Sequence, residues 1–201
     1  MRITDIKAQV KREGRYSVFV DGKYSFSLSE NELLSSGIKI GQEFDEQGLQ
    51  ELKEKAIEDK ALMRAYDLLA RRPRSTWEMR DYLIRKDYPD QLIEKILNTL
   101  SNRGYLDDEK FARSWVENRR LLKNTSKRRL RLELQQKRIS PDIISRVLEA
   151  DQTDERAVLK DIIAKKRQQI RYKDDQKLIA YLLRQGFNYA DIKSVLHDNK
   201  Q

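Results

Sequence analysis

The segment 104–109 (Gly-Tyr-Leu-Asp-Asp-Glu) is the part of the sequence best suited to chemistry, because it brings three carboxylates together. Adjacent carboxylates can bind a divalent cation or exchange protons with a substrate. However, no second acidic cluster is spaced to complete a cation site, and Phe111 and Trp115 follow at helical i,i+4 spacing. We therefore expect the glycine to end one helix, Asp107 or Asp108 to cap the next, and the aromatic pair to pack in a core.

Other catalytic chemistry lacks the residues that it needs. The 201-residue chain has no cysteine and one histidine, His197, which excludes disulfides, thiolate nucleophiles and cysteine zinc sites and argues against a serine–histidine pair. The glycine motifs GxxxxGK[ST] and GxGxxG, which hold nucleotide phosphates, are both missing from the sequence. We therefore expect a protein that is not an enzyme and that uses no metal and no cofactor.

A second group of notable side chains is basic. The chain carries 42 Lys and Arg against 33 Asp and Glu, and residues 119–138 alone hold nine basic residues against one acidic residue, Glu133. Solvated helices usually mix Glu with Lys at i,i+4, so this unbalanced stretch predicts a polyanionic or acidic partner. We expect the partner or DNA to contact these nine residues, which are Arg119, Arg120, Lys123, Lys127, Arg128, Arg129, Arg131, Lys137 and Arg138.

A smaller basic excess occurs over residues 160–173, with six basic residues against one acidic residue. We interpret it as a secondary basic patch. The alternative for both stretches is that they are only solvated helix faces. The residues of the secondary patch are Lys165, Lys166, Arg167 and Arg171.

Apolar patterning places a small β-rich module before the helices. Apolar residues recur at every second position on either side of Asp21-Gly22, which predicts a β-hairpin; they are Tyr16, Val18 and Val20, and then Tyr24, Phe26 and Leu28. Residues 3–10 can supply a third strand. The spacing of Ser29-Glu30-Asn31-Glu32 is that of a capping box, so we expect a short helix there, ended by Gly37.

The register of the hairpin has two solutions. A two-residue turn pairs Val20 with Lys23, whereas a three-residue loop pairs Val20 with Tyr24 and puts both apolar sets on one face. We favour the three-residue loop.

From about residue 49 onward the apolar period is helical, and the pattern repeats three times. Four apolar positions recur at an offset of 51 residues and then of 48 residues. The three sets are Leu83, Tyr88, Ile93 and Leu97; Leu134, Ile139, Ile144 and Leu148; and Leu182, Phe187, Ile192 and Leu196.

Helix start signals recur in the same register. Ser75, Thr125-Ser126 and Asp174-Asp175 precede the middle helices, and Pro89, Ser140-Pro141 and Asn188 precede the last helices. We expect Trp77, Tyr82 and Tyr88, which occupy helical positions, to pack in the core rather than stack on bases.

These patterns predict a mainly α fold made of three tandem three-helix-bundle repeats in an elongated curved array, preceded by a small three-strand module. The expected boundaries are 1–50 for the β-rich module, 51–107 for a linker helix and repeat 1, 108–151 for repeat 2 and 152–201 for repeat 3. The start of the sequence lacks the apolar stretch of a secretory signal, and no apolar run is long enough to span a membrane. We therefore expect a soluble, cytoplasmic protein, and a monomer.

The sequence resembles the RecX regulators of the bacterial recombinase RecA. The resemblance is carried by the signature Gly104, Tyr105, Leu106, Asp107, Asp108, Phe111, Ala112 and Trp115, by Arg119, and by the stretch Arg128–Ile139. It extends over about residues 59–198. The glycine usual in the family's lysine–glycine turn is Asp87 in the first repeat and Arg138 in the second, and only Gly186 keeps it.

The resemblance implies a modulator that lodges along the groove of a RecA filament on single-stranded DNA. Such a protein commonly restrains the ATPase, strand-exchange and coprotease activities of RecA, in recombination, repair and the SOS response. Two alternatives remain open. One is a self-sufficient DNA-binding protein that uses the helix at 126–138 for recognition, with Gln135 and Gln136 as base readers; the other is an enzyme that uses carboxylates alone.

Overall fold

The computed structural model describes residues 1–198 and divides into two compact units. Unit 1 comprises Met1–Arg74 and Met79–Leu106, and unit 2 comprises Ser75–Glu78 and the chain from Asp107 onward. The last three residues of the predicted third repeat, 199–201, lie outside the described residues.

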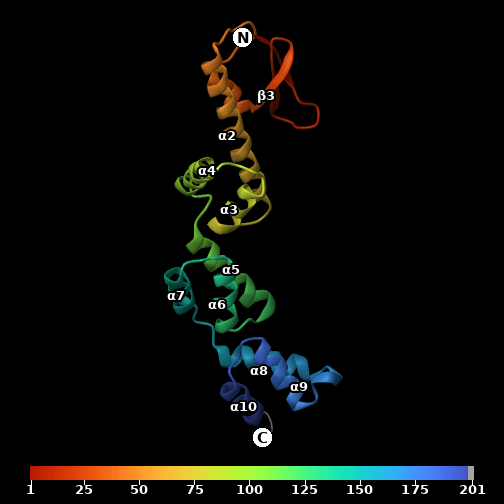
Figure 1. Ribbon diagram of the computed structural model, residues 1–201. Helices are drawn as coiled ribbons and strands as arrows, with labels where there is room; N and C mark the ends of the chain where they lie inside the picture. The colour runs from red at the N-terminus through yellow and green to blue at the C-terminus, as the bar shows by residue number, and fades with distance from the viewer. Residues whose placement is uncertain (199–201) are drawn as a thin grey trace. The chain divides into compact units, whose positions relative to one another are not determined.

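Unit 1 combines a sheet with helices (Figure 1). Its elements are β1 (Ile3–Ala8), β2 (Arg15–Val20), β3 (Lys23–Ser29), α1 (Glu30–Ser36), α2 (Glu46–Arg71), most of α3 (Thr76–Ile84) and α4 (Asp90–Asn102).

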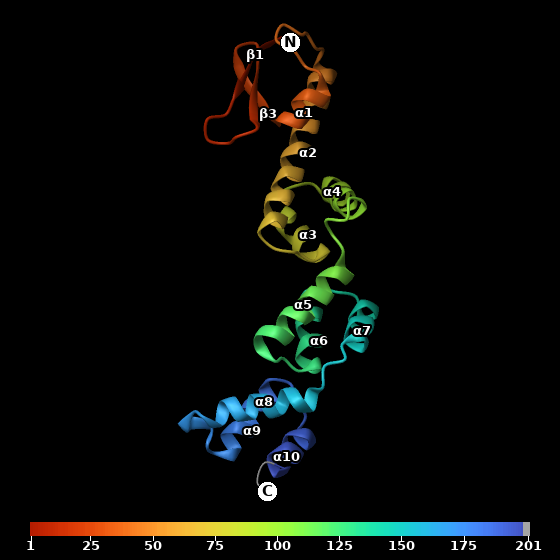
Figure 2. The same ribbon diagram turned by 180° about the vertical axis from the view of Figure 1, so that it is seen from behind.

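Unit 2 is helical (Figure 2). It holds the first turn of α3, followed by α5 (Asp108–Lys123), α6 (Lys127–Gln136), α7 (Pro141–Ala150), α8 (Glu155–Arg167), the 3-10 turn η1 (Ile170–Tyr172), α9 (Asp175–Arg184) and α10 (Tyr189–Asp198). The predicted fold class, helical repeats after a three-strand module, is confirmed.

The sheet is antiparallel in the order β1-β2-β3, and its hairpin turn corrects one prediction. Val20 pairs with Lys23, so the turn has two residues, and Asp21 and Gly22 both have positive φ, as a type I′ turn requires. The favoured three-residue loop is therefore wrong at the tip. A bulge then shifts the register, so that Val18 pairs with Phe26 and both side chains are buried on one face.

Helix α2 belongs to two hydrophobic cores of unit 1. Leu49, Leu52 and Ala56 from its first half pack with the sheet, whereas Ala61 and Ala65 from its second half pack with α3 and α4. Figure 1 shows α2 running from the sheet to these two helices. Because 26 residues of one helix supply both sets, the β-rich module and the first helical cluster have no flexible linker between them.

The three predicted repeats each form a helical cluster. The first combines α2, α3 and α4, the second α5, α6 and α7, and the third α8, α9 and α10. Of the twelve recurrent apolar positions, eleven are buried, and Tyr88 is half-buried against the first cluster. The repeat alignment is therefore confirmed at the level of packing.

The middle helix of each repeat ends in the same turn, whatever residue occupies it. Asp87, Arg138 and Gly186 all have positive φ, of 58°, 57° and 91°. In each repeat the amide that follows donates to a carbonyl five residues earlier, as from Ile139 N to Leu134 O at 3.1 Å. This is a Schellman arrangement, so the two departures from glycine leave the turn unchanged.

The predicted caps are present. Ser29, Ser126, Ser140 and Asp174 each accept a backbone N–H in the first turn of their helices. Ser75 and Glu78 cap reciprocally, since the Glu78 amide donates to Ser75 Oγ at 3.2 Å and the Ser75 amide donates to the Glu78 carboxylate at 3.4 Å.

Two of these cap serines also donate a hydrogen bond within unit 2. Ser126 Oγ donates to the carbonyl of Gln185 at 2.7 Å, and Ser75 Oγ donates to the carbonyl of Lys137 at 3.0 Å. Gln185 and Lys137 occupy equivalent positions at the ends of α9 and α6. Each serine is therefore both the cap of one middle helix and a partner of the C-terminus of the next one.

We expect Gly186→Ala to destabilise unit 2 strongly. A Cβ at this position would lie 2.6 Å from Ser126 Oγ and 3.1 Å from the Arg129 amide nitrogen, and the positive φ adds backbone strain. Overpacking together with this strain costs about 2–4 kcal/mol. The measurement is the free energy of unfolding by urea.

Gly104→Ala is the matched control, because Gly104 also has positive φ but has open space around its Cβ position. The strain alone costs about 1 kcal/mol there. Equal losses for the two variants would contradict the close packing of Gly186 on Ser126.

Candidate functional site

Asp107 is a helix cap. Its side chain accepts from the backbone amides of Glu109 and Lys110, both at 3.0 Å, and Gly104 ends α4 with a φ of 75°. The Lys110 amide in particular holds the pKa of Asp107 below its usual range. Among residues 1–198 no group of three or more metal-ligating side chains converges. The prediction that Asp107 or Asp108 caps the next helix is therefore confirmed for Asp107.

The other residues of the signature are structural as well. Asp108 accepts from the Thr76 amide at 2.8 Å, and Phe111 and Ala112 are buried in the core of the second repeat. Trp115 packs against the same core and donates from its ring nitrogen to Glu133 at 2.9 Å. The predicted i,i+4 aromatic pair is present, with ring centroids 5.8 Å apart.

Arg120 is the most enclosed cation of the 119–138 stretch. Its side chain is 10% exposed and donates twice to Asp151, from Nε at 2.9 Å and from Nη2 at 2.6 Å. It also donates to the carbonyl of Thr125 and reaches Glu155 at 3.4 Å. Arg120 therefore ties α5 to the segment between α7 and α8, and its charge is compensated within the protein.

Two further cations of the stretch bracket Trp115. Arg119 lies over the indole ring at 4.6 Å and pairs with Glu133 at 2.7 Å, and Lys137 lies at 5.2 Å from the ring centroid and pairs with Glu78. Cation–π and ionic contacts of this kind position the side chains from two directions. Arg119 and Lys137 thus belong largely to the packing of unit 2.

The remaining cations form a solvent-facing set on and beside α6. Arg129 is 45% exposed and lies 3.5 Å from Glu133. The other five have no carboxylate within ion-pair distance in the described part of the chain, and all but the half-buried Lys127 are exposed. We call these five the α6 basic face: Lys123, Lys127, Arg128, Arg131 and Arg138.

The secondary patch divides in a similar way. Arg167 pairs with Asp175 and donates to the carbonyls of Tyr172 and Lys173. Lys166 lies over the rings of Tyr172 and Tyr181, at 5.4 and 4.8 Å. Lys165 and Arg171 are exposed, and Arg171 also lies 5.8 Å from the ring centroid of Tyr172.

Of the three aromatic residues predicted to pack in the core, two do so in part. Tyr82 and Tyr88 lie against the first helical cluster, whereas Trp77 is 41% exposed. The prediction for Trp77 is wrong, because the apolar stripe of α3 is carried by Met79 and Leu83, both fully buried.

Models of known families match most of the chain. Residues 1–45 match the N-terminal domain of regulatory protein RecX, residues 61–100 match the first RecX three-helix domain, and residues 107–148 match the second. Regulatory protein RecX of Lactobacillus delbrueckii subsp. bulgaricus is 32% identical, over 98% of this chain and 74% of its own length. The chain belongs to the RecX family.

Other relatives agree. The RecX proteins of Listeria monocytogenes and Bacillus velezensis are each 32% identical, over 93% and 98% of this chain and 71% and 77% of their own lengths. A crystal structure of regulatory protein RecX matches with a TM-score of 0.72 at 27% identity, covering 98% of both chains. The structure of RecX from Lactobacillus salivarius has the same fold, with a TM-score of 0.60 at 22% identity over 70% of this chain and 95% of its own.

The relatives are named regulatory proteins, so this RecX-family chain has a regulatory role. None of the helices described is both long and apolar enough to cross a bilayer.

We expect Arg120→Met to destabilise the RecX fold by about 3–5 kcal/mol, because Asp151, with a side chain 8% exposed, would lose its buried counter-charge. The measurement is urea unfolding at neutral pH. Arg113→Met on the same helix is the control, since Arg113 is 47% exposed and its i,i+4 pair with Glu109 is worth about 0.5 kcal/mol or less. Similar effects of the two substitutions would contradict a structural role for Arg120.

The same buried pair predicts a pH dependence. Burial alone would raise the pKa of Asp151, but hydrogen bonds from Thr153 and Arg120 outweigh it and hold the pKa below its usual value. A depressed carboxyl pKa stabilises the fold above the unfolded value of about 3.9, and this stabilisation is lost as the pH falls through the folded value. Stability should therefore fall below about pH 4, and less steeply in Asp151→Asn. Parallel pH profiles would contradict this assignment.

Proposed function

We propose that this chain binds the RecA filament on single-stranded DNA and restrains its ATPase, strand-exchange and coprotease activities. It would act as a cytoplasmic monomer and as a modulator rather than an enzyme. The observation that carries the proposal is the α6 basic face, in a chain that belongs to a family of regulatory proteins.

The α6 basic face suits a phosphate-bearing partner for an electrostatic reason. Five cations lie within sixteen residues and have no ion-pair partner among residues 1–198, so their mutual repulsion destabilises the free protein slightly. An external polyanion removes that repulsion and releases condensed counterions. Arg120, Arg119 and Lys137 are left out of the proposed surface because their charges are already compensated internally.

The second candidate is a self-sufficient DNA-binding protein, with α6 as its recognition helix. It is favoured by the exposure of Gln135 and Gln136 beside the arginines, since amide side chains can read adenine in the major groove. The two candidate functions differ in the partner that the protein binds tightly. A filament regulator binds naked DNA weakly and the nucleoprotein filament strongly, whereas a recognition-helix protein binds duplex DNA in a sequence-dependent way.

The test is RecA ATP hydrolysis on single-stranded DNA, with this protein titrated from well below stoichiometric amounts. We expect inhibition at substoichiometric ratios, because a ligand that prefers one filament state shifts a whole filament segment. Arg128→Glu combined with Arg131→Glu should abolish the inhibition and leave helical circular dichroism unchanged.

Lys23→Glu combined with Lys39→Glu is the matched control. Both side chains are exposed, and this double variant changes the net charge by the same amount as Arg128→Glu combined with Arg131→Glu. It should inhibit like the unmodified chain. No effect of the unmodified chain on ATP hydrolysis, with sequence-dependent binding of duplex DNA, would replace the proposal by the second candidate.

A further inference from the structure

A second group of cations lies in unit 1, outside both basic stretches. Arg12 from the β1–β2 connection, Lys60 and Arg64 from α2, and Lys86 from the end of α3 line one hollow of about 530 Å³. The segments that supply them are close to electrically balanced in sequence, so the cluster exists only through the fold.

These four cations are not neutralised by ion pairs in the part of the chain that the structure describes. Within residues 1–198 none of them has a carboxylate at ion-pair distance, although Glu13 and Asp67 also line the hollow. Arg15, at its base, is buried and already faces Asp59 at 3.7 Å. Burial, and then the positive charges of Arg64, Arg15 and Arg12, hold the pKa of Lys60 below its usual range. The hollow therefore gathers an excess of positive charge that no ion pair among the described residues neutralises.

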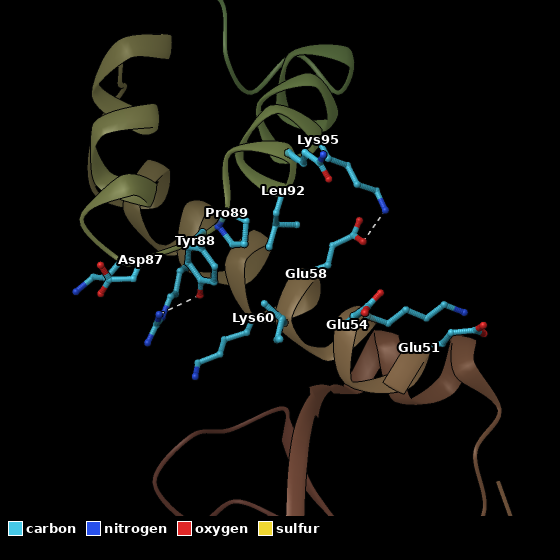
Figure 3. A pocket seen from close by; sticks show the side chains of 14 residues that line it. Glu51, Glu54, Glu58, Lys60, Asp87, Tyr88, Pro89, Leu92 and Lys95 are labelled. Carbon is cyan, nitrogen blue, oxygen red and sulfur yellow. Dashed lines mark hydrogen bonds and ion pairs between the residues drawn. The ribbon is translucent and has the colours of Figure 1, made fainter. Parts of the chain in front are cut away.

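Several of the cations are held in position. Arg64 donates to the hydroxyl of Tyr88 at 3.0 Å, drawn as a dashed line in Figure 3, and lies over the same ring. Lys86 lies 5.8 Å from the ring centroid of Tyr82, which also lines the hollow. A side chain that is already oriented loses less entropy when it binds a ligand.

A neighbouring groove defines the limits of the cluster. This groove, of about 980 Å³, shares Lys60, Arg64 and Lys86 with the first hollow, but its other side carries glutamates (Figure 3). Glu58 pairs there with Lys95 at 2.6 Å. An anion is therefore favoured only where the two hollows meet, at the end that holds the three shared cations.

We propose that this cluster is a second binding site for the phosphate backbone of single-stranded nucleic acid, with Arg12, Lys60, Arg64 and Lys86 as the phosphate-binding side chains. We call it the unit 1 phosphate site. Tyr82 packs only in part against the first helical cluster and also lines the hollow. It favours a single strand over an acidic protein segment, because a basic hollow beside a partly exposed aromatic ring can bind a phosphate and stack the adjoining base. The site rests on the proposed function only in that the strand it binds would be the one inside the filament.

The test is the salt dependence of binding between the full chain and a fluorescently labelled oligothymidine, followed by anisotropy without RecA. Each single-strand phosphate neutralised contributes about 0.7 to the slope of log affinity against log salt. Lys60→Gln combined with Lys86→Gln should therefore lower the slope by about 1.4 and weaken binding several-fold at low salt.

Lys23→Gln combined with Lys39→Gln removes the same charge from exposed positions outside the hollow and should leave the slope unchanged. Equal slopes for the two double variants would overturn the site, because only net charge would then matter. The site would also be overturned if Lys60→Gln combined with Lys86→Gln lost filament binding but bound oligothymidine like the control. The cluster would then bind a protein and not a nucleic acid.

A single variant distinguishes loss of the unit 1 phosphate site from loss of folding, and the absence of RecA distinguishes it from failure of the proposed function. Lys86→Gln alone, at an exposed turn position, should lower the slope by about half as much and leave the thermal unfolding midpoint unchanged. Since no RecA is present, failure of the proposed RecA regulation would leave this result intact, and failure here would leave the ATPase result intact.

Discussion

The hydroxyls of Ser75 and Ser126, which cap the middle helices α3 and α6, make the contacts on which the packing of unit 2 depends. Ser126 accepts from the first turn of its own helix and donates to the carbonyl at the end of α9. Ser75 makes the same two bonds with its own helix and with the end of α6. Both serines are fully buried, so neither hydroxyl could exchange these partners for water. In each case one hydroxyl oxygen satisfies a backbone amide at the start of one helix and a backbone carbonyl at the end of another.

The contact of Ser75 with Lys137 and the contact of Ser126 with Gln185 form two joints between helices, and the two joints differ in the residues around the serine. In one, Lys137 and Glu78 add an ion pair, and the residue in the left-handed turn is Arg138. In the other, the equivalents of the ion pair are Gln185 and Arg129, and the backbone approaches so closely that only glycine fits at 186. One joint is therefore strengthened by side-chain electrostatics and the other by close backbone packing.

Much of this architecture could be predicted from the sequence, because it follows from local signals. The capping serines, the proline at the start of α7 and the twelve recurrent apolar positions depend on residues within a few turns of one another. The bulge at β3 could not be predicted, since Ser25 becomes the unpaired residue only when the tight turn and the burial of Val18 are both satisfied. The prediction for Trp77 is wrong because helical spacing alone does not determine which face of the helix packs against the core.

The candidate sites were harder to predict, because charge compensation acts over long sequence distances. Arg120 finds Asp151 31 residues away, and Lys137 finds Glu78 59 residues away, so a window of twenty residues overstates the free positive charge. The converse holds for Arg12, Lys60 and Lys86, which no sequence window brings together. Ion pairs formed on folding neutralise cations of the 119–138 stretch, whereas folding brings the cations of the unit 1 phosphate site together.

Helix α2 has a consequence for how unit 1 loses its structure. Its first half is covered by the sheet and its second half by α3 and α4, and buried Asp59 lies between them, accepting from the amide and hydroxyl of Ser29. Fraying of the sheet would expose the apolar residues in the first half of α2 to water. It would also remove the hydrogen bonds that Ser29 donates to Asp59. The β-rich module and the first helical cluster should therefore open together, as one cooperative unit, and amide protons in both should exchange with a common free energy of opening.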